Sequence, residues 1–241
     1  MKSPADASLG AIPVLILCGG LGTRLQPVLK DRPKALAESG GRVFIDILLD
    51  RLRQAGFRRF ILCVGHMASH IAAHFQDHLT GDVEFSREDH PLGTGGAVKK
   101  ALPLASERPL LILNGDSLCE LDYGRLLESH AGHPEALTIV LAKNTGNRKD
   151  CGYVAMDRSG RITSFEEKSG KPAERLVNAG IYLAGSKALQ FLPETEKFSL
   201  EHDVFPVLVR KGLCFGFATD SELLDIGTPD RLKIFEKSWR A

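Results

Sequence analysis

The chain has 241 residues, of which 43% are hydrophobic and 25% are charged, and its formal net charge is +1. This composition predicts a globular protein with a substantial core, and the balanced charge excludes a strongly basic nucleic-acid-binding surface. No apolar run approaches the ~20 residues of a membrane-spanning helix. Residues 1–11 lack the apolar segment of a secretory signal and predict a flexible lead. We therefore expect a cytoplasmic protein with no membrane or nucleic-acid partner.

The first half of the chain alternates short apolar runs with longer segments of helical period. The segment 44–55 places apolar side chains on one face and charged ones elsewhere, and Gly56 predicts its end. Such alternation predicts a parallel sheet with helices on both faces. The predicted strands are 14–18, 59–64, 83–86 and 110–114, and the further predicted helices are 67–78 and 94–105.

The order of predicted elements changes after about Leu121, where strand-like segments follow one another with little helix between them. This change predicts an antiparallel extension of the sheet, followed by a closing helix–strand–helix sequence. No linker separates the two halves, so we expect one domain over 12–241. The predicted strands are 138–142, 153–157, 161–167, 176–184 and 214–218, and the predicted helices lie near 200–210 and from Pro229 onward.

Five cysteines are scattered along the chain without a CxxC pair. Their odd number and irregular spacing predict reduced thiols, several acting as small core residues, rather than disulfides or metal ligands. They are Cys18, Cys63, Cys119, Cys151 and Cys214.

A glycine-rich loop follows the first predicted strand, in the stretch GGLGTRLQPVLKDRPKAL. In an open α/β sheet, ligands bind at the carboxyl ends of the strands. Gly19, Gly20 and Gly22 allow backbone N–H groups to approach an oxyanion, and Arg24 adds a guanidinium fork suited to phosphate. Pro33 restrains the backbone immediately before Lys34. The pattern predicts an anion site, and the alternative is a glycine-rich turn with solvated charges.

Two familiar phosphate-binding motifs do not match this loop. The nucleotide-triphosphatase loop requires a GK pair after its glycine, and that pair is missing. The dinucleotide fingerprint must open directly into a helix, whereas Pro27 and Pro33 follow these glycines. A dehydrogenase is therefore excluded as a reading of the loop.

The loop resembles the signature GGxGTRLxPxTxxxPKxL of the sugar-1-phosphate nucleotidylyltransferases, with Leu29 where the family usually has threonine. The resemblance implies a Rossmann-like three-layer α/β fold, with a mixed, mostly parallel sheet and a small antiparallel sugar-binding extension. It also implies a nucleotide-binding half over 12–120 and a sugar-binding half over 121–241. Further family-like blocks follow in order: PLGTGGAV, LLILNGDS, FEEK, VNAGIYL and LLDIGTP.

The resemblance implies a reaction in which a sugar 1-phosphate attacks the α-phosphorus of a nucleoside triphosphate and pyrophosphate leaves, with Mg²⁺ as cofactor. The protein must align the two substrates and neutralise the developing charge. By resemblance, Arg24 contacts the triphosphate and Lys34 bridges the α-phosphate and the sugar phosphate. The catalytic residues would be Arg24, Lys34 and Asp116, and the nucleotide-binding residues Gly19, Gly20, Gly22, Thr23, Arg24, Glu88, Gly93 and Thr94.

Asp116 and Asp225 match the metal-binding aspartates of the family. Each follows an apolar run, and a carboxylate at a strand end suits a hard cation such as Mg²⁺. The alternatives are an Asx turn at Asp116 and a helix-start carboxylate at Asp225. The sugar-binding residues implied by the resemblance are Gly152, Glu167, Lys168, Asn178 and Gly180.

The base and the sugar are less sharply indicated than the reaction. Glu88 offers only acceptors, which suits the adjacent N1–H and amino donors of guanine and favours GTP. The blocks PLGTGGA, FSLEHD and DIGTP look most like those of bacterial heptose-1-phosphate guanylyltransferases, which make precursors of surface glycans. Mannose 1-phosphate remains possible as the sugar substrate, and UTP, CTP, ATP or dTTP as the nucleotide.

Four histidines recur every four residues, at His66, His70, His74 and His78. A spacing of four drifts by about 40° per step around a helix, so the four cannot converge on one ion. A solvated helix face is the preferred interpretation, with a metal site as the alternative.

An alternative from another class is a catalytically silent regulatory subunit that senses a nucleotide-sugar. Such a protein would be expected to lose the lysine or the metal aspartates, whereas this chain retains all of them. The chain leaves no room after DIGTP for a second catalytic domain, so we expect a single activity. The resemblance also makes a homodimer reasonable.

Overall fold

The computed structural model describes residues 9–76, 81–143, 152–167 and 176–239. Most strands form one sheet in the order β5-β4-β1-β6-β11-β8-β12-β7, with β9 and β10 attached beside β11. The neighbours β5, β4, β1 and β6 are parallel, whereas β11 runs antiparallel to both β6 and β8. The predicted mixed α/β fold, with a parallel first half and an antiparallel extension, is therefore confirmed.

Nine of the described strands correspond to predicted apolar runs, whereas the short strands at 38–39, 42–43 and 117–119 were not predicted. The strand bounds are β1 Val14–Leu17, β2 Glu38–Ser39, β3 Arg42–Val43, β4 Phe60–Val64, β5 Val83–Arg87, β6 Leu110–Asn114, β7 Ser117–Cys119, β8 Leu137–Lys143, β9 Tyr153–Met156, β10 Ile162–Glu166, β11 Leu176–Ala184 and β12 Cys214–Asp225. The helices are α2 Gln26–Leu29, α3 Phe44–Ala55, α4 Ala68–Gln76, α5 Gly93–Ala101, α6 Tyr123–Ala131, α7 Ser186–Leu189, α8 Phe205–Arg210 and α9 Pro229–Trp239.

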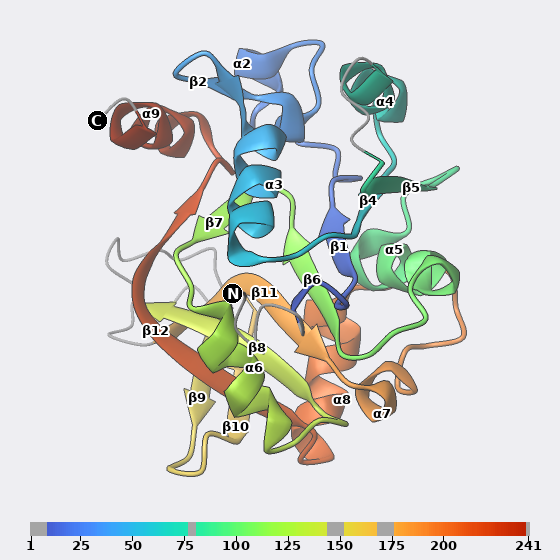
Figure 1. Ribbon diagram of the computed structural model, residues 1–241, viewed down its shortest axis with the longest axis vertical. Helices are drawn as coiled ribbons and strands as arrows, with labels where there is room; N and C mark the ends of the chain where they lie inside the picture. Colours follow the sequence, from blue (N-terminus) through green and yellow to red (C-terminus); the bar gives the residue numbers. More distant parts are fainter. Residues whose placement is uncertain (1–8, 77–80, 144–151, 168–175, 240–241) are drawn as a thin grey trace.

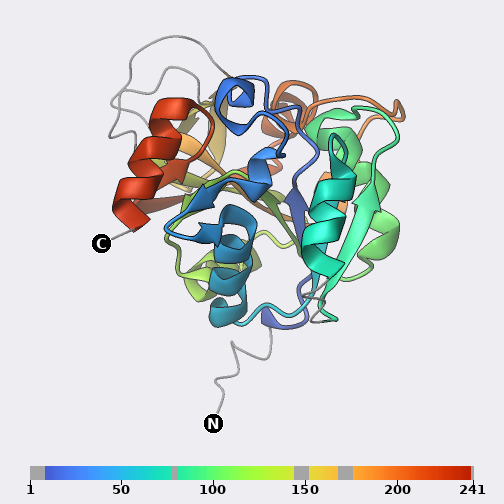
Figure 2. The same cartoon turned by 90° about the horizontal axis from the view of Figure 1, so that it is seen from above.

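Alternation along the central strands divides the core into two layers. In β1, Val14 and Ile16 face the layer formed with α3, α4, α6 and α9, whereas Leu15 faces the layer formed with α5, α7 and α8. Successive strand side chains point to opposite faces, so an unbroken apolar run must be buried on both sides. Figures 1 and 2 show how the helices surround the sheet, with α9 beside β12 at one end of the molecule and α4 and α5 at the other.

Helix α3 shows how local sequence sets an element. Phe44, Ile47, Leu48 and Leu52 recur at helical spacing and are buried. The helix ends at Gly56, whose φ of 116° lies in the left-handed region that favours glycine. Both the helix and its end match the sequence prediction.

The second half differs from the sequence prediction in three places, one of which is the short helix α7, which was not predicted. A nine-residue helix, α6, stands where little helix was expected, and Asp122 caps it by accepting a hydrogen bond from the Arg125 N–H. Strand β12 continues through residue 225 rather than ending near 218. Its second part pairs with β7, and β11 pairs with β6, so strands from the two predicted halves share one sheet. The division into a nucleotide half and a sugar half remains a prediction.

Four of the five cysteines, Cys18, Cys63, Cys119 and Cys214, are buried free thiols, and Cys151 lies outside the described residues. Within the described part of the chain, every helix is too short or too polar to cross a bilayer.

Buried His130 gives the fold a measurable pH dependence. Its Nδ1 lies 2.8 Å from Thr138 Oγ1, and His133 Nε2 lies 3.1 Å from the same oxygen. Burial, with a smaller effect of His133, lowers the pKa of His130 from 6.5 to about 4. Since the unfolded chain takes up this proton below about pH 6.5 and the folded chain does not, stability falls as the pH drops from 6.5 to 4. The full loss is about 3 kcal/mol.

Urea unfolding of wild type and His130→Gln between pH 7 and pH 4 checks this expectation. The variant should lose the His130 part of the slope, whereas His70→Gln, at an exposed position, should keep it. Parallel slopes for wild type and His130→Gln would show that the buried imidazole is not the cause.

Candidate active site

The glycine-rich loop leaves the end of β1 and lines a cavity of about 310 Å³. Gly22 has a φ of 61°, which favours glycine, and a Cβ on Gly19 would lie only 2.3 Å from Glu88 Oε1. Leu29, the departure from the family signature, packs against the core instead of lining this cavity. The predicted residues that line the cavity are Gly20, Gly22, Thr23, Arg24, Lys34 and Asp116.

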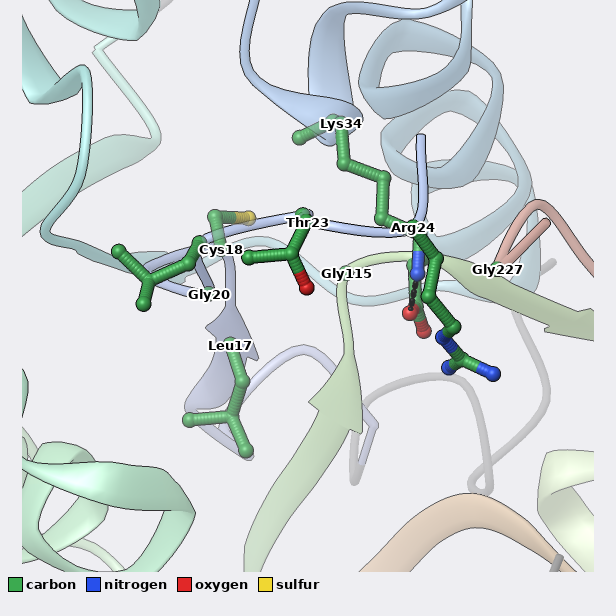
Figure 3. Close-up of a pocket in the computed structure, with 12 residues that line it drawn as sticks. Leu17, Cys18, Gly20, Thr23, Arg24, Lys34, Gly115 and Gly227 are labelled. Carbon is green, nitrogen blue, oxygen red and sulfur yellow. Dashed lines mark hydrogen bonds and ion pairs between the residues drawn. The ribbon is translucent and has the colours of Figure 1, made fainter. Parts of the chain in front are cut away.

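Lys34 is placed by the proline before it. Pro33 is extended, with φ −66° and ψ 149°, and Lys34 begins a short 3-10 helix, Lys34–Leu36. The Lys34 ammonium forms a salt bridge with Asp116, and both side chains are partly shielded from solvent. Figure 3 shows Lys34 and Arg24 converging beside Gly115 and Gly227.

The pairing of β7 with β12 brings the two predicted metal aspartates together. In this antiparallel pair Asp225 lies opposite Ser117, the residue after Asp116. The Ile226 N–H donates to the Asp116 carbonyl over 3.0 Å, and the Ser117 hydroxyl donates to Asp116 Oδ1 over 2.8 Å. Two carboxylates far apart in the sequence therefore occupy one edge of the sheet.

Asp225 is oriented by two donors on the same oxygen. The Gly227 N–H and the Arg231 guanidinium donate to Asp225 Oδ1 over 2.8 and 3.2 Å. A Cβ on Gly227 would lie 3.6 Å from both Arg24 Nη2 and Lys34 Nζ. The Arg24 guanidinium, the Lys34 ammonium and the Asp225 carboxylate therefore all lie close to Gly227. Such a cluster can hold phosphate oxygens and a hard cation at the same place.

A second cavity, of about 300 Å³, adjoins the loop on the side of α5. Glu88 lines it, and Glu88 Oε2 accepts the Leu92 N–H over 3.1 Å. Gly93 has a φ of 75°, and a Cβ there would lie 2.5 Å from the Phe198 carbonyl oxygen. The predicted residues at this cavity are Gly19, Gly20, Glu88, Gly93 and Thr94.

The predicted sugar-binding residues surround a third cavity, of about 130 Å³. A Cβ on Gly152 would lie 2.6 Å from Glu167 Oε2, so glycine leaves room for that carboxylate. Gly180 has a φ of 72° at an irregularity in β11, and it faces the Asn114 side chain. Gly152, Glu167, Asn178 and Gly180 line the cavity, and Lys168 lies outside the described residues.

The structure adds four lining residues with polar side chains that sequence reasoning missed: Asn114, Ser117, Glu201 and Arg231. Asn114 and Ser117 flank the predicted Asp116, and Glu201 lies in the FSLEHD block. These positions were readable in the sequence, but only the fold shows that they face a cavity.

Cys18 lines the first cavity but is not an activated nucleophile. Burial, with a smaller effect of the Asp116 charge, raises the pKa of its thiol to about 12. A protonated thiol is a poor nucleophile. The chemistry of this cavity therefore does not rest on a thiolate at Cys18.

The three histidines of the repeat that the structure describes have different surroundings. His66 precedes α4, His70 is exposed on it, and His74 Nε2 lies 2.9 Å from Asp46 Oδ1. His78 lies outside the described residues. Among the residues that the structure describes, no three histidine, cysteine or acidic side chains are grouped as metal ligands.

Comparisons with known proteins point to one family. Residues 13–237 match the nucleotidyl transferase family. The chain is 33% identical over 224 residues to a D-glycero-alpha-D-manno-heptose 1-phosphate guanylyltransferase from Aneurinibacillus thermoaerophilus, covering 92% of this chain and 96% of that one. It is 31% identical to a mannose-1-phosphate guanylyltransferase from Mycobacterium tuberculosis, covering 91% of this chain but only 62% of that protein.

A solved structure is also similar. HddC from Yersinia pseudotuberculosis, complexed with GMP-PN, superimposes with a TM-score of 0.82 and 31% sequence identity, over 95% of this chain and 99% of that one. The Rossmann-like three-layer fold is shared over nearly the whole length.

Proposed function

The chain belongs to the nucleotidyl transferase family, and from this premise we propose that it joins a nucleoside triphosphate to a sugar 1-phosphate and releases pyrophosphate. GTP and D-glycero-α-D-manno-heptose 1-phosphate are the favoured substrates and GDP-heptose the product, on the similarity to the Aneurinibacillus enzyme. Mannose 1-phosphate is the second candidate, on the similarity to the mycobacterial enzyme.

One observation carries the proposal: Asp116 lines all three cavities and is paired with Lys34. A transfer between two bound substrates requires their reacting groups to meet at one point. We assign this meeting point to Asp116. The loop and Glu88 line the second cavity on one side of Asp116, and Asn178 and Glu167 line the third cavity on the other.

The roles of the charged residues are those that the family resemblance implies, and the placement of the residues around these cavities supports them. The loop N–H groups and Arg24 would hold the triphosphate, with Arg24 beside the leaving pyrophosphate. Lys34 would contact the α-phosphate and the entering sugar phosphate, where negative charge increases during transfer. Fixed cations aimed at this charge stabilise the transition state without reorganisation.

Asp116 and Asp225 fit a magnesium ion. Mg²⁺ is commonly held by one or two carboxylates together with substrate phosphates and water, and these residues supply two carboxylates at one sheet edge. When bound, the ion would polarise phosphate oxygens and neutralise charge on them. Asp116 and Asp225 would hold it, while Ser117, Gly227 and Arg231 orient their carboxylates.

The sugar would occupy the third cavity. Glu167 and Asn178 can bind hydroxyl groups there, and Gly152 and Gly180 leave the space that the ring needs. On the family resemblance alone, Lys168 would bind the phosphate of the sugar 1-phosphate. A cytoplasmic location and a homodimeric state belong to the same proposal.

A pyrophosphate-release screen tests the function. Five nucleoside triphosphates are combined with heptose, mannose, glucose and N-acetylglucosamine 1-phosphates in the presence of Mg²⁺. We expect the highest kcat/KM for GTP with the heptose substrate. Absence of turnover with every pair, together with nucleotide-sugar binding, would support a regulatory subunit instead.

Glu88 gives a prediction for base selection. Replacing Glu88 with glutamine should lower kcat/KM for GTP about tenfold while changing kcat/KM for UTP much less. Guanine offers two adjacent donors, N1–H and the amino group, and the NH2 group of glutamine cannot accept a hydrogen bond from either. The amide oxygen can still accept the Leu92 N–H, so the fold should be preserved. Glu84→Gln, at an exposed position on β5, the strand that ends just before Glu88, is the matched control. An unchanged ratio of GTP to UTP efficiency would remove Glu88 from base recognition.

A further inference from the structure

The FSLEHD block folds into a π-helix, Leu200–Val204, that brings Glu201 to the third cavity. Ser199 caps this turn, because its hydroxyl oxygen accepts the N–H groups of Glu201 and His202, each over 3.2 Å. A single π-turn is uncommon and is found disproportionately at functional sites. The proposed reaction assigns no role to this segment.

One oxygen of Glu201 is hydrogen-bonded to the start of α5, beside the second cavity. The Thr94 hydroxyl donates to Glu201 Oε2 over 2.6 Å, and the Ser199 hydroxyl donates to the same oxygen over 2.7 Å. Thr94 Oγ1 in turn accepts the Leu200 N–H over 2.9 Å. Thr94 lines the second cavity together with Glu88. Glu201 Oε2, which accepts from Thr94, therefore helps to hold one wall of that cavity in place.

The other oxygen of Glu201 faces the sugar side. The Tyr182 hydroxyl donates to Glu201 Oε1 over 3.5 Å, a long contact, and accepts from Asn178 Nδ2 over 2.9 Å. Burial, followed by the Glu201 charge, raises the pKa of Tyr182 well above its usual value, so the phenol stays protonated. Asn178 Oδ1 accepts the Gly180 N–H over 2.9 Å. The Asn178 amide is therefore held at both ends.

We propose that Glu201 is a positioning residue that acts on both substrates: one oxygen orients Thr94, and the other, through Tyr182, orients Asn178. The inference rests on the proposed function of the site. It explains why a carboxylate, which only accepts, stands where three hydroxyl groups donate.

Replacing Glu201 with glutamine should change the contact with Tyr182 while keeping the contacts with Thr94 and Ser199. Thr94 and Ser199 oxygens already accept backbone N–H groups, so the amide oxygen must face them and the amide nitrogen must face Tyr182. The Tyr182 hydroxyl then loses its acceptor, and its bond to Asn178 is weakened. The nucleotide side keeps its contacts.

The experiment measures kcat and both KM values, together with sugar 1-phosphate affinity by calorimetry. We expect Glu201→Gln to raise the KM for sugar 1-phosphate about tenfold, the effect of one hydrogen bond, with the KM for GTP and kcat within about threefold of wild type. Tyr182→Phe should raise the same constant, and the double variant should match the single variants rather than multiply them. Glu201→Ala should raise both KM values.

Glu196→Gln is the matched control, since Glu196 is an exposed glutamate five residues away whose carboxylate lies 3.3 Å from His90 Nε2 and lines none of the three cavities. A lowered melting temperature with both KM values unchanged would overturn the inference and leave Glu201 a structural residue. Multiplicative effects of the two substitutions would also overturn it. Failure of wild type to turn over any substrate pair would instead overturn the proposed function, while the calorimetric comparison would still test Glu201.

Discussion

Asp116→Asn is expected to lower kcat by about 10³-fold, because it removes charge at the point that all three cavities share. Asparagine has nearly the same shape, and its amide oxygen can still accept from the Ser117 hydroxyl. It is a much weaker ligand for a hard cation than a carboxylate. Steady-state pyrophosphate release at several Mg²⁺ concentrations measures the effect.

Asp89→Asn is the control for this substitution. Asp89 is exposed and pairs with Lys100, and neither residue lines any of the three cavities, so its variant should retain wild-type kcat. Full activity of Asp116→Asn at limiting Mg²⁺ would remove Asp116 from the proposed metal site.

Lys34→Met is expected to lower kcat by about 10²- to 10³-fold, because a fixed cation beside the reacting phosphates is lost. Methionine retains the length and apolar stem of lysine without its charge. The effect should appear in kcat more than in KM for the nucleotide, since charge on the transferred phosphate grows toward the transition state. Single-turnover measurements with saturating nucleotide separate the two.

Lys100→Met is the matched control, since Lys100 lies on α5 and pairs with the exposed Asp89. The folding stability of Lys34→Met should change little, because a partly exposed ion pair contributes only about 0–1 kcal/mol. A variant with normal kcat and a raised KM alone would place Lys34 in ground-state binding.

Local sequence determined most of the parallel half of the fold. The run at 14–18 is apolar at every position, and a run this short that ends at glycines is typical of a strand buried on both faces. Helix α3 follows from its spacing and from Gly56. Helix α6 was missed, because its buried positions Leu126 and His130 form a sparse pattern and one of them is polar. Its capping residue, Asp122, was a local signal that could have been used.

The candidate site likewise has features that local sequence determines and features that only strand pairing determines. The glycine-rich loop, Lys34 after its proline, and a carboxylate at the end of an apolar run could all be recognised from neighbouring residues. The meeting of Asp116 with Asp225 could not, because it depends on the pairing of β7 with β12. Only tertiary structure decides which remote backbone groups pair, since that choice follows from burying whole strand faces together. The bridge that Glu201 makes between Thr94 and Tyr182 has the same origin, because three separate segments supply its hydrogen bonds.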